Sequence, residues 1–160
     1  MKSIKDHENL DHKYVLLRLD LNVPLKNGIV TDQTRIDKIL PIINFLLSKN
    51  SRIIVISHVG RPNGKKNNSL SMRPICKNLE EKINRKIKLI NNDIFKLKKE
   101  DLFKDKEDEI IFLENIRFYK EEVKNDTSFA KQLASLADLF VNDAFSCSHR
   151  THTSVSKITE

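Results

Sequence analysis

The sequence predicts an α/β fold in which a parallel sheet carries helices on both of its faces. Short runs rich in Val, Ile and Leu recur along the chain, and amphipathic stretches of about 10–15 residues separate them. The runs are apolar at successive positions, as in strands that are buried on both faces of a sheet. With 39% hydrophobic and 32% charged residues, the composition is that of a folded globular chain. We find no repeat or linker, so we expect one domain.

The first apolar run, at residues 15–17, opens the stretch VLLRLDLNVP. Polar residues then alternate with apolar ones until Pro24 prevents further strand pairing. These polar residues are Arg18, Asp20 and Asn22. A buried and unpaired charge is costly, and ligands bind beyond the carboxyl ends of strands in open α/β sheets. We therefore expect this strand to end at a ligand site.

The other elements follow in order along the chain. A turn at residues 26–28 precedes an amphipathic helix that begins after Thr31 or Asp32 as N-cap, contains a possible kink at Pro41 and ends near Asn50. Further strands are predicted at residues 52–57, 87–90, 110–113 and 139–141. Further helices are predicted at residues 71–83 and after a cap at Asp126, with short helical turns over residues 91–109. Polar loops are expected at residues 58–70, 114–124 and from 142 onward.

The formal net charge of +7 and the pI near 9.4 favour anionic partners. Nucleic acid is disfavoured, because the lysines are scattered and the chain has 6% aromatic residues and no Trp for bases to stack on. No apolar run approaches the roughly 20 residues of a membrane helix. The polar N-terminus is unlike a secretory signal, and two distant cysteines fit a reducing compartment. We expect a cytoplasmic protein without nucleic-acid or membrane partners.

Arginine is concentrated where the strands are predicted to end. Five of the eight arginines fall at this edge of the sheet or on the helix that follows it, although the chain has 21 lysines. They are Arg18, Arg35, Arg61, Arg117 and Arg150. The planar guanidinium group binds carboxylate or phosphate with two bonds at a time, which ammonium cannot do. The alternative is a set of separate surface pairs, such as Arg117 with Glu114 or Glu121, which would contribute little.

Histidines add further donors at these strand ends. They are His58, His149 and His152. A zinc site made by Cys147, His149 and His152 would lack a fourth ligand, and nothing in the sequence lowers the pKa of Cys147 for nucleophilic attack. The three glycines form neither of the two glycine-rich nucleotide motifs. The residues thus predict an anion-binding site without a metal and without a phosphate-binding glycine loop.

Five segments, taken in order, resemble motifs of the phosphoglycerate kinase family. They are RLDLNVPL, TDQTRI, SHVGRPNG, LENIRF, and LADLFVNDAF followed by SHRTHTS. Together they extend over nearly the whole chain, from Tyr14 to Ser154. The sequence departs from the family pattern at Leu21, where Phe is usual, and at Ser146, Cys147 and Ser148, where the family has Gly and other small residues.

The resemblance implies a Rossmann-like domain, the N-terminal half of a two-domain kinase. Residues 1–160 would form the N-terminal domain that binds 3-phosphoglycerate. MgATP or MgADP would bind mainly to a C-terminal domain that is absent from this chain, and no cofactor would bind here. The implied reaction is the glycolytic, reversible transfer of a phosphoryl group between 1,3-bisphosphoglycerate and ADP, in a cytoplasmic monomer.

The resemblance also implies roles for individual residues. Arg35 would be catalytic, because its family counterpart stabilises the phosphoryl group during transfer. The residues implied to bind 3-phosphoglycerate are Asp20, Asn22, Arg35, His58, Arg61, Arg117 and Arg150, and those implied to line the same basic patch are Arg18, His149 and His152. The residues alone leave open a second interpretation, a non-catalytic module that binds an anionic metabolite in the same pocket.

Overall fold

The computed structural model describes residues 3–104 and 110–144, so predictions at residues 105–109 and beyond 144 lie outside the described residues. Its centre is a five-stranded sheet with the order β5-β6-β4-β1-β7, in which every neighbouring pair is parallel. The strands are β1 (Tyr14–Leu19), β4 (Arg52–Ile56), β5 (Ile87–Ile90), β6 (Ile110–Leu113) and β7 (Leu139–Asp143). The predicted parallel sheet is confirmed.

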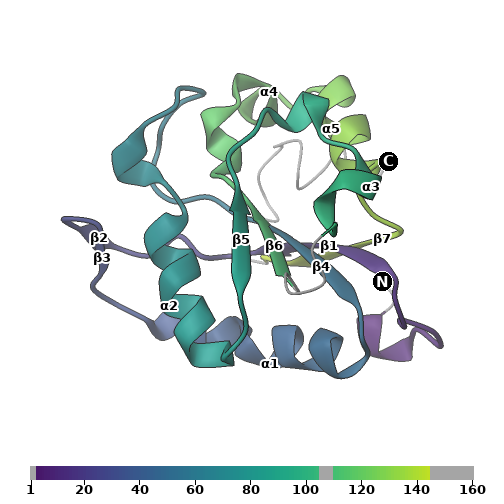
Figure 1. Cartoon of the computed structure of the whole chain (residues 1–160). Helices are drawn as coiled ribbons and strands as arrows, with labels where there is room; N and C mark the ends of the chain where they lie inside the picture. The colour runs from purple at the N-terminus through teal and green to yellow at the C-terminus, as the bar shows by residue number, and fades with distance from the viewer. Residues whose placement is uncertain (1–2, 105–109, 145–160) are drawn as a thin grey trace.

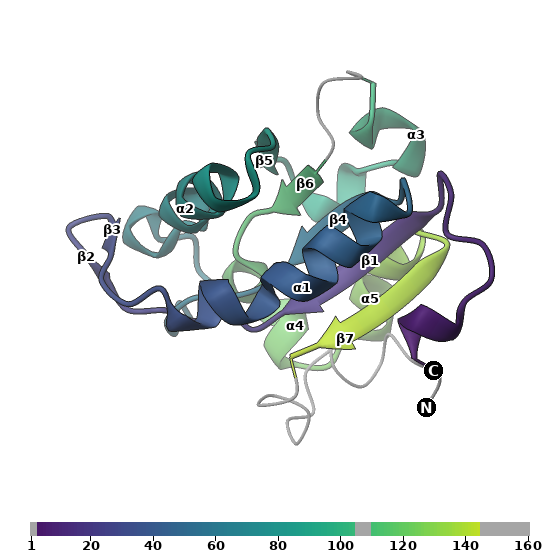
Figure 2. The same ribbon diagram turned by 90° about the horizontal axis from the view of Figure 1, so that it is seen from below.

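Helices cover both faces of this sheet (Figures 1 and 2). On one face lie α1 (Thr34–Ser48) and α2 (Arg73–Ile83). On the other lie α3 (Lys99–Leu102), α4 (Lys120–Val123) and α5 (Thr127–Ala134), together with the 3₁₀ turns η3 (Ile94–Lys96) and η4 (Ile116–Phe118). Two further 3₁₀ turns are η1 (Ile4–Asp6) and η2 (Asn68–Leu70). Within the described part of the chain, no helix has the length and apolarity needed to cross a membrane.

Successive residues of the central strands belong to two different cores. In β1, Val15 and Leu17 pack with α1 and α2, whereas Leu16 between them packs with α5. The same alternation divides the residues of β4 and β6 between the two layers. This arrangement explains why the strands are apolar at successive positions, since both of their faces are buried.

The structure differs from the prediction in four places. The expected loop over residues 114–124 contains η4 and α4. Asn142 and Asp143 belong to β7 rather than to a loop, because β1 continues to pair with them as far as Leu19. Residues 25–30 form a hairpin of β2 (Leu25–Lys26) and β3 (Ile29–Val30). Its turn, Asn27-Gly28, has φ of 50° and 72°, as in the tight turns that join antiparallel strands.

The fourth difference concerns the start of α1. Its N-cap is Gln33, which makes no side-chain capping bond. Asp32 instead accepts hydrogen bonds from the N–H and Oγ1 of Thr34, at 2.9 and 2.6 Å, and these bonds lower the pKa of Asp32. Pro41 lies inside α1. The predicted cap of α5 is confirmed, because the Asp126 carboxylate accepts from the Phe129 N–H at 2.9 Å.

Candidate functional site

The loops that follow β1 and β4 are joined where the two strands end. The hydroxyl of Ser57, directly after β4, donates to the Leu19 carbonyl at 2.7 Å and accepts from the Leu21 N–H at 3.2 Å. Ser57 is fully buried. The loop that carries Asp20 and Asn22 therefore has a fixed position relative to the loop that carries His58 and Arg61.

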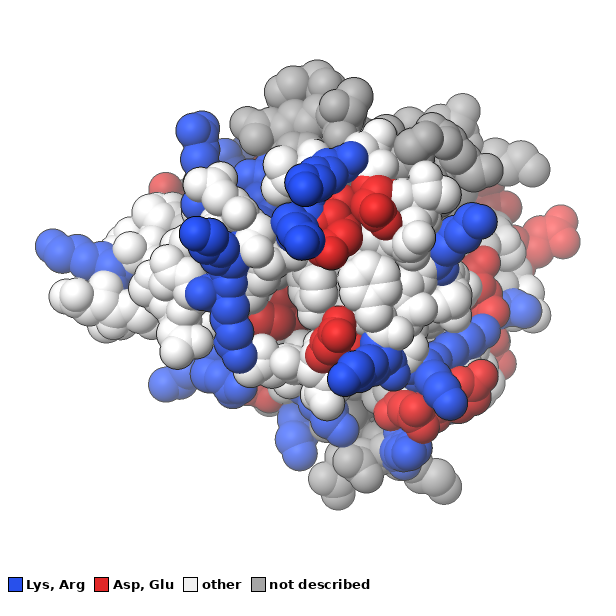
Figure 3. Space-filling model, turned by 90° about the horizontal axis from the view of Figure 1, so that it is seen from above, with Lys and Arg blue, Asp and Glu red and all other residues white. Residues whose placement is uncertain are grey.

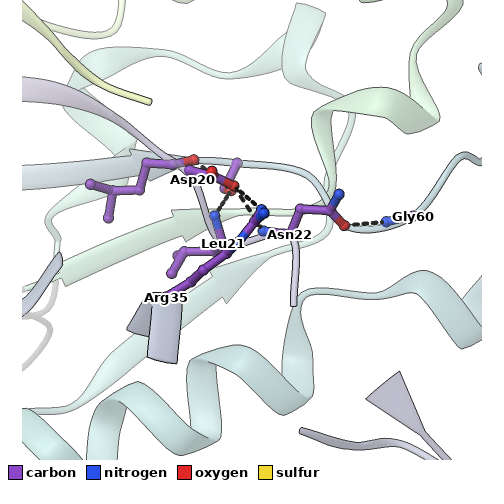
Figure 4. A network of polar contacts seen from close by, with 7 residues as sticks. Asp20, Leu21, Asn22, Arg35 and Gly60 are labelled. Carbon is purple, nitrogen blue, oxygen red and sulfur yellow. Dashed lines mark hydrogen bonds and ion pairs between the residues drawn. The ribbon is translucent and has the colours of Figure 1, made fainter. Parts of the chain in front are cut away.

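Asp20 and Arg35 form an ion pair at this edge of the sheet (Figure 4). Arg35 Nη1 lies 2.8 Å from Asp20 Oδ1, which also accepts from the Asn22 N–H at 3.4 Å. The Arg35 side chain is 47% exposed and that of Asp20 is 18% exposed. An exposed pair of this kind adds little stability. Its main consequence is to hold a guanidinium group at the predicted site.

Asn22 connects the loops after β1 and β4 a second time. Its Oδ1 accepts from the Gly60 N–H at 3.0 Å (Figure 4). The NH₂ of the same side chain can only donate, so Asn22 would offer a ligand a hydrogen-bond donor. Gly60 has φ of 64°, and a Cβ at this position would lie 2.7 Å from a methyl carbon of Leu70. Glycine is therefore the residue that fits at the contact with Asn22.

Three of the predicted basic residues are buried rather than exposed at this edge. Arg18 is 0% exposed, within β1 and in register with Ile56 and Asn142. His58 and Arg117 are 2% and 6% exposed. Arg117 is therefore not part of an exposed surface pair, which was the alternative for this arginine, because its side chain is buried.

The remaining predicted residues are either exposed or lie outside the described residues. Arg61 is exposed in the loop after β4. Arg150, His149 and His152 lie outside the described residues, as does Cys147, the residue of the alternative zinc and nucleophile interpretations. Elsewhere, Lys and Arg side chains are interspersed with Asp and Glu on the face that carries α4 and α5 (Figure 3). This distribution agrees with scattered surface lysines.

A cavity of about 590 Å³ adjoins the site. It lies between the β2–β3 hairpin and the loop after β4, and Asn22 and Gly60 form part of its wall. No arginine is among the described residues that line it. The cavity is therefore beside the predicted anion site rather than at its cationic groups.

Burial raises the pKa of two side chains, one at the end of β7 and one within α2. Burial raises the pKa of Asp143, at the end of β7. Burial also raises the pKa of the Cys76 thiol in α2 far above its ordinary value, which makes that thiol unreactive. Among residues 3–104 and 110–144, no three His, Cys, Asp or Glu side chains are grouped so as to hold a metal ion.

Sequence reasoning missed the residues that support the site. Glu114 directly follows β6, and its carboxylate accepts from Ser71 Oγ, the Met72 N–H and the Asn115 N–H at 2.7, 2.7 and 2.9 Å. It thereby anchors the chain just before α2. Glu114 and Asn115 both belong to the segment LENIRF, in which the family resemblance implies a binding role for Arg117 alone.

A family model described as phosphoglycerate kinase matches residues 4–160. The chain belongs to the phosphoglycerate kinase family. The family resemblance expected from the five motifs is thereby confirmed.

Relatives and solved structures from this family agree with the assignment. Phosphoglycerate kinase of Wolbachia sp. subsp. Brugia malayi (strain TRS) is 49% identical over 162 residues, which cover 100% of this chain and 40% of that protein. The structure of phosphoglycerate kinase from Coxiella burnetii has a TM-score of 0.86 and 37% identity, covering 97% of this chain and 38% of that one. The crystal structure of phosphoglycerate kinase from Pyrococcus horikoshii OT3 has a TM-score of 0.83 and 31% identity, and the match covers 98% of this chain and 40% of that one.

These comparisons confirm the Rossmann-like α/β fold as that of solved phosphoglycerate kinase structures. The chain spans about 40% of the length of the curated phosphoglycerate kinases that it matches. The roles of individual site residues stay predictions.

Proposed function

We propose that this chain is the N-terminal, 3-phosphoglycerate-binding domain of a phosphoglycerate kinase. The protein that contains it would reversibly transfer a phosphoryl group between 1,3-bisphosphoglycerate and MgADP, giving 3-phosphoglycerate and MgATP, as a cytoplasmic monomer. The observation that carries the proposal is the Asp20–Arg35 pair beside Asn22 at the carboxyl edge of the sheet. An anion, a cation and an amide meet there, and together they can bind the charge and the hydroxyl of a hydroxylated anion.

The neighbouring polar groups suit different parts of 3-phosphoglycerate. Asp20 can accept from the substrate hydroxyl, and the NH₂ of Asn22 can donate to it. Guanidinium groups suit its phosphate and carboxylate, because they bind such groups with two parallel bonds. We assign this role to Arg35, Arg61, Arg117 and Arg150, with His58 as a further donor and with Arg18, His149 and His152 in the surrounding basic patch.

The chemistry of the proposed reaction agrees with a site rich in cations. The carboxylate that attacks or leaves is already ionised at neutral pH, so the reaction requires no general base. Phosphoryl transfer depends mostly on positioning and on stabilisation of charge at the transferring group. Arg35 is the residue we assign to that charge.

The described residues do not fit a magnesium nucleotide. No cluster of metal-binding side chains occurs among them, and the three glycines do not form a phosphate-binding loop. We therefore assign MgATP and MgADP mainly to the C-terminal domain, and we derive no step through the nucleotide.

Titration calorimetry of the 160-residue chain with 3-phosphoglycerate tests the binding function. We expect binding at low salt, and at least about tenfold weaker binding by Asn22→Ala, since the ligand would lose a hydrogen-bond partner and the contact of Asn22 with the Gly60 N–H would be lost. The matched control is Asn44→Ala, because Asn44 is exposed on α1. Absence of heat with the unaltered chain at low salt would contradict the proposal.

The alternative is a non-catalytic module that binds an anionic metabolite. It predicts the same calorimetric result but no phosphoryl transfer by the protein that contains this chain. A coupled assay of ATP formation from 1,3-bisphosphoglycerate and MgADP, with that protein, distinguishes the two.

A further inference from the structure

Asn115, directly after β6, is fully buried and uses both ends of its side-chain amide. Nδ2 donates to the Val59 carbonyl at 2.8 Å and to the Leu70 carbonyl at 2.9 Å. Oδ1 accepts from the Arg117 N–H at 3.1 Å. One side chain therefore joins the chain after β6 to two points of the connection between β4 and α2.

The two carbonyl contacts hold both ends of one segment. Val59 and Leu70 bracket the part of the β4–α2 loop that contains Gly60 and Arg61. Because both protons of a single NH₂ are used, the two ends of this segment must stay close to each other and to the end of β6.

Two backbone contacts extend the same junction. The Ile116 N–H donates to the Ser57 carbonyl at 3.2 Å, and the Gly64 N–H donates to the Arg117 carbonyl at 3.0 Å. The loop after β4 thus lies against the two residues that follow Asn115, through Ser57 before Val59 and Gly64 after it. At Gly60 it also contacts Asn22 in the loop after β1.

We propose that Asn115 is a positioning residue that sets Arg61 and Arg117 at a fixed separation from Asn22. The inference rests on the proposed function and deepens it, since those three residues are assigned to the same ligand. Asn115 itself does not contact the ligand. It acts through the loop that carries Arg61 and through the backbone of Arg117, because binding groups are effective only when the surrounding residues fix their geometry.

The variant Asn115→Asp isolates the two donors. It keeps the size of the side chain and an oxygen that can accept from the Arg117 N–H, but it places a second oxygen opposite the Val59 and Leu70 carbonyls. We expect the loop after β4 to move away from the end of β6. Asn44→Asp is the matched control, because it makes the same chemical change on an exposed part of α1.

Glycine amides report on the loop without any ligand. The chain has three glycines, so protein labelled with ¹⁵N-glycine gives three backbone signals. In Asn115→Asp the Gly60 and Gly64 signals should shift, while the Gly28 signal in the β2–β3 turn should keep its position. Unchanged Gly60 and Gly64 signals would overturn the inference, whether or not the chain binds 3-phosphoglycerate.

Calorimetry with 3-phosphoglycerate then tests positioning of the arginines. We expect Asn115→Asp to weaken binding by at least about tenfold, since small displacements of binding groups cost up to roughly a hundredfold. In a double-mutant cycle with Arg61→Lys, the second substitution should cost less than it costs alone, because both act on the same contact. If the two substitutions instead lowered the affinity independently, so that their fold-losses multiplied, Asn115 would not act through Arg61 and the inference would be overturned.

The outcomes for the two proposals are separate. If the unaltered chain fails to bind 3-phosphoglycerate, the proposed function is wrong, and the glycine signals still decide whether Asn115 holds the loop. If Asn115→Asp does not fold, Asn115→Ser gives the same readings, because its hydroxyl keeps an acceptor near the Arg117 N–H and is too short to reach both carbonyls.

Discussion

Asp20 and Arg35 contact each other at 2.8 Å, so any anion that binds Arg35 must share it with a carboxylate. This pairing has two effects. It holds the guanidinium group in place before a ligand arrives, and it leaves the other donors of the group for that ligand. Arg35 comes from the first turn of α1, whereas Asn22 comes from the loop after β1. We assign Arg35 to the transferring phosphoryl group and Asn22 to the substrate hydroxyl, and the different elements that carry them allow these two roles to be tested separately.

Arg35→Lys should lower kcat far more than it raises KM in the protein that carries this chain. Lysine keeps the charge but loses the planar fork of donors. If Arg35 acts on the phosphoryl group during transfer, the loss in transition-state stabilisation should be about 2–4 kcal/mol. Steady-state kinetics measure it.

Arg61→Lys and Arg117→Lys are the controls. They should act mainly on KM for 3-phosphoglycerate, because the groups that we assign to them do not move during the proposed reaction. If Arg35→Lys also changed KM alone, Arg35 would belong to substrate binding and its catalytic assignment would be wrong.

At the scale of elements, the loop after β4 packs closely against the start of α4. Gly64 has φ of 77°, and a Cβ at this position would lie 2.8 Å from the backbone Cα of Lys120. Gly28, in the β2–β3 turn, has a similar φ of 72°, but a Cβ there would have no atom within 4 Å. A side chain at Gly28 would cause backbone strain alone, whereas a side chain at Gly64 would cause backbone strain and a steric clash with Lys120.

Gly64→Ala should destabilise the chain more than Gly28→Ala. Both substitutions place a side chain in the left-handed region, at a cost of about 1–2 kcal/mol. Gly64→Ala should add at least about 1 kcal/mol, since backbone atoms of α4 must move. Urea unfolding of the two variants measures the difference. Equal losses would show that the loop adapts without displacing α4.

Asp138, just before β7, connects three elements at the opposite edge of the sheet. Its carboxylate accepts from Lys99 of α3 and, at 2.9 Å, from the Tyr14 N–H of β1. The bond from Lys99, followed by that from Tyr14, lowers the pKa of Asp138 below its ordinary value of 3.8. The lowered pKa means that ionised Asp138 stabilises the folded chain. This stabilisation is present above the pKa that Asp138 has in the unfolded chain, and it is lost as the pH falls through the lower pKa of Asp138 in the folded chain.

Asp138→Asn should therefore destabilise the chain at neutral pH and have little effect in strong acid. The pair is partly exposed, so the expected loss at neutral pH is under about 1 kcal/mol. Urea unfolding at neutral pH and near pH 2 compares the two conditions. Asp11→Asn, at an exposed turn, is the control. If Asp138→Asn lowered the free energy of unfolding by the same amount at both pH values, this account would be wrong.

The bounds of a strand could be predicted from the sequence where polar residues mark both ends of a largely apolar run. The predicted bounds of β5 and β6 match the structure, because β6 is an apolar run between polar residues and β5 has only Lys88 among its apolar residues. The β2–β3 hairpin was missed because strands of two residues have no measurable periodicity. The role of Asn115 could not be predicted, since the carbonyls that it binds are 56 and 45 positions away along the chain.

At the scale of the whole molecule, a net charge of +7 should attract anions of many kinds. Lysine and arginine are nevertheless mixed with acidic residues on the face that carries α4 and α5 (Figure 3). We therefore expect selectivity for one anion to arise at the edge of the sheet, where Asp20, Asn22 and Arg35 meet.

3-Phosphoglycerate should stabilise the folded chain, and salt should reduce the effect. A ligand at a hundred times its Kd adds about 2.7 kcal/mol to the free energy of unfolding. Raising the salt from 0.1 to 1 M shortens the screening length from about 10 to about 3 Å, which weakens partly exposed contacts. Thermal melts at both salt concentrations measure the shift. A single-stranded oligonucleotide should give no shift, and an equal shift with the oligonucleotide would contradict the selectivity.

The order of the sheet also bears on how the chain folds during synthesis. Tyr14 and Asp138, which stand at the start of β1 and just before β7, are 124 positions apart. At 5–20 residues per second, a ribosome needs roughly 6–25 s to add the residues between them. Until then β1 can pair with β4, but its other edge presents unsatisfied N–H and C=O groups to neighbouring chains. We therefore expect a nascent chain paused before residue 139 to expose this edge of β1 to aggregation, and a chaperone that covers the edge should protect it.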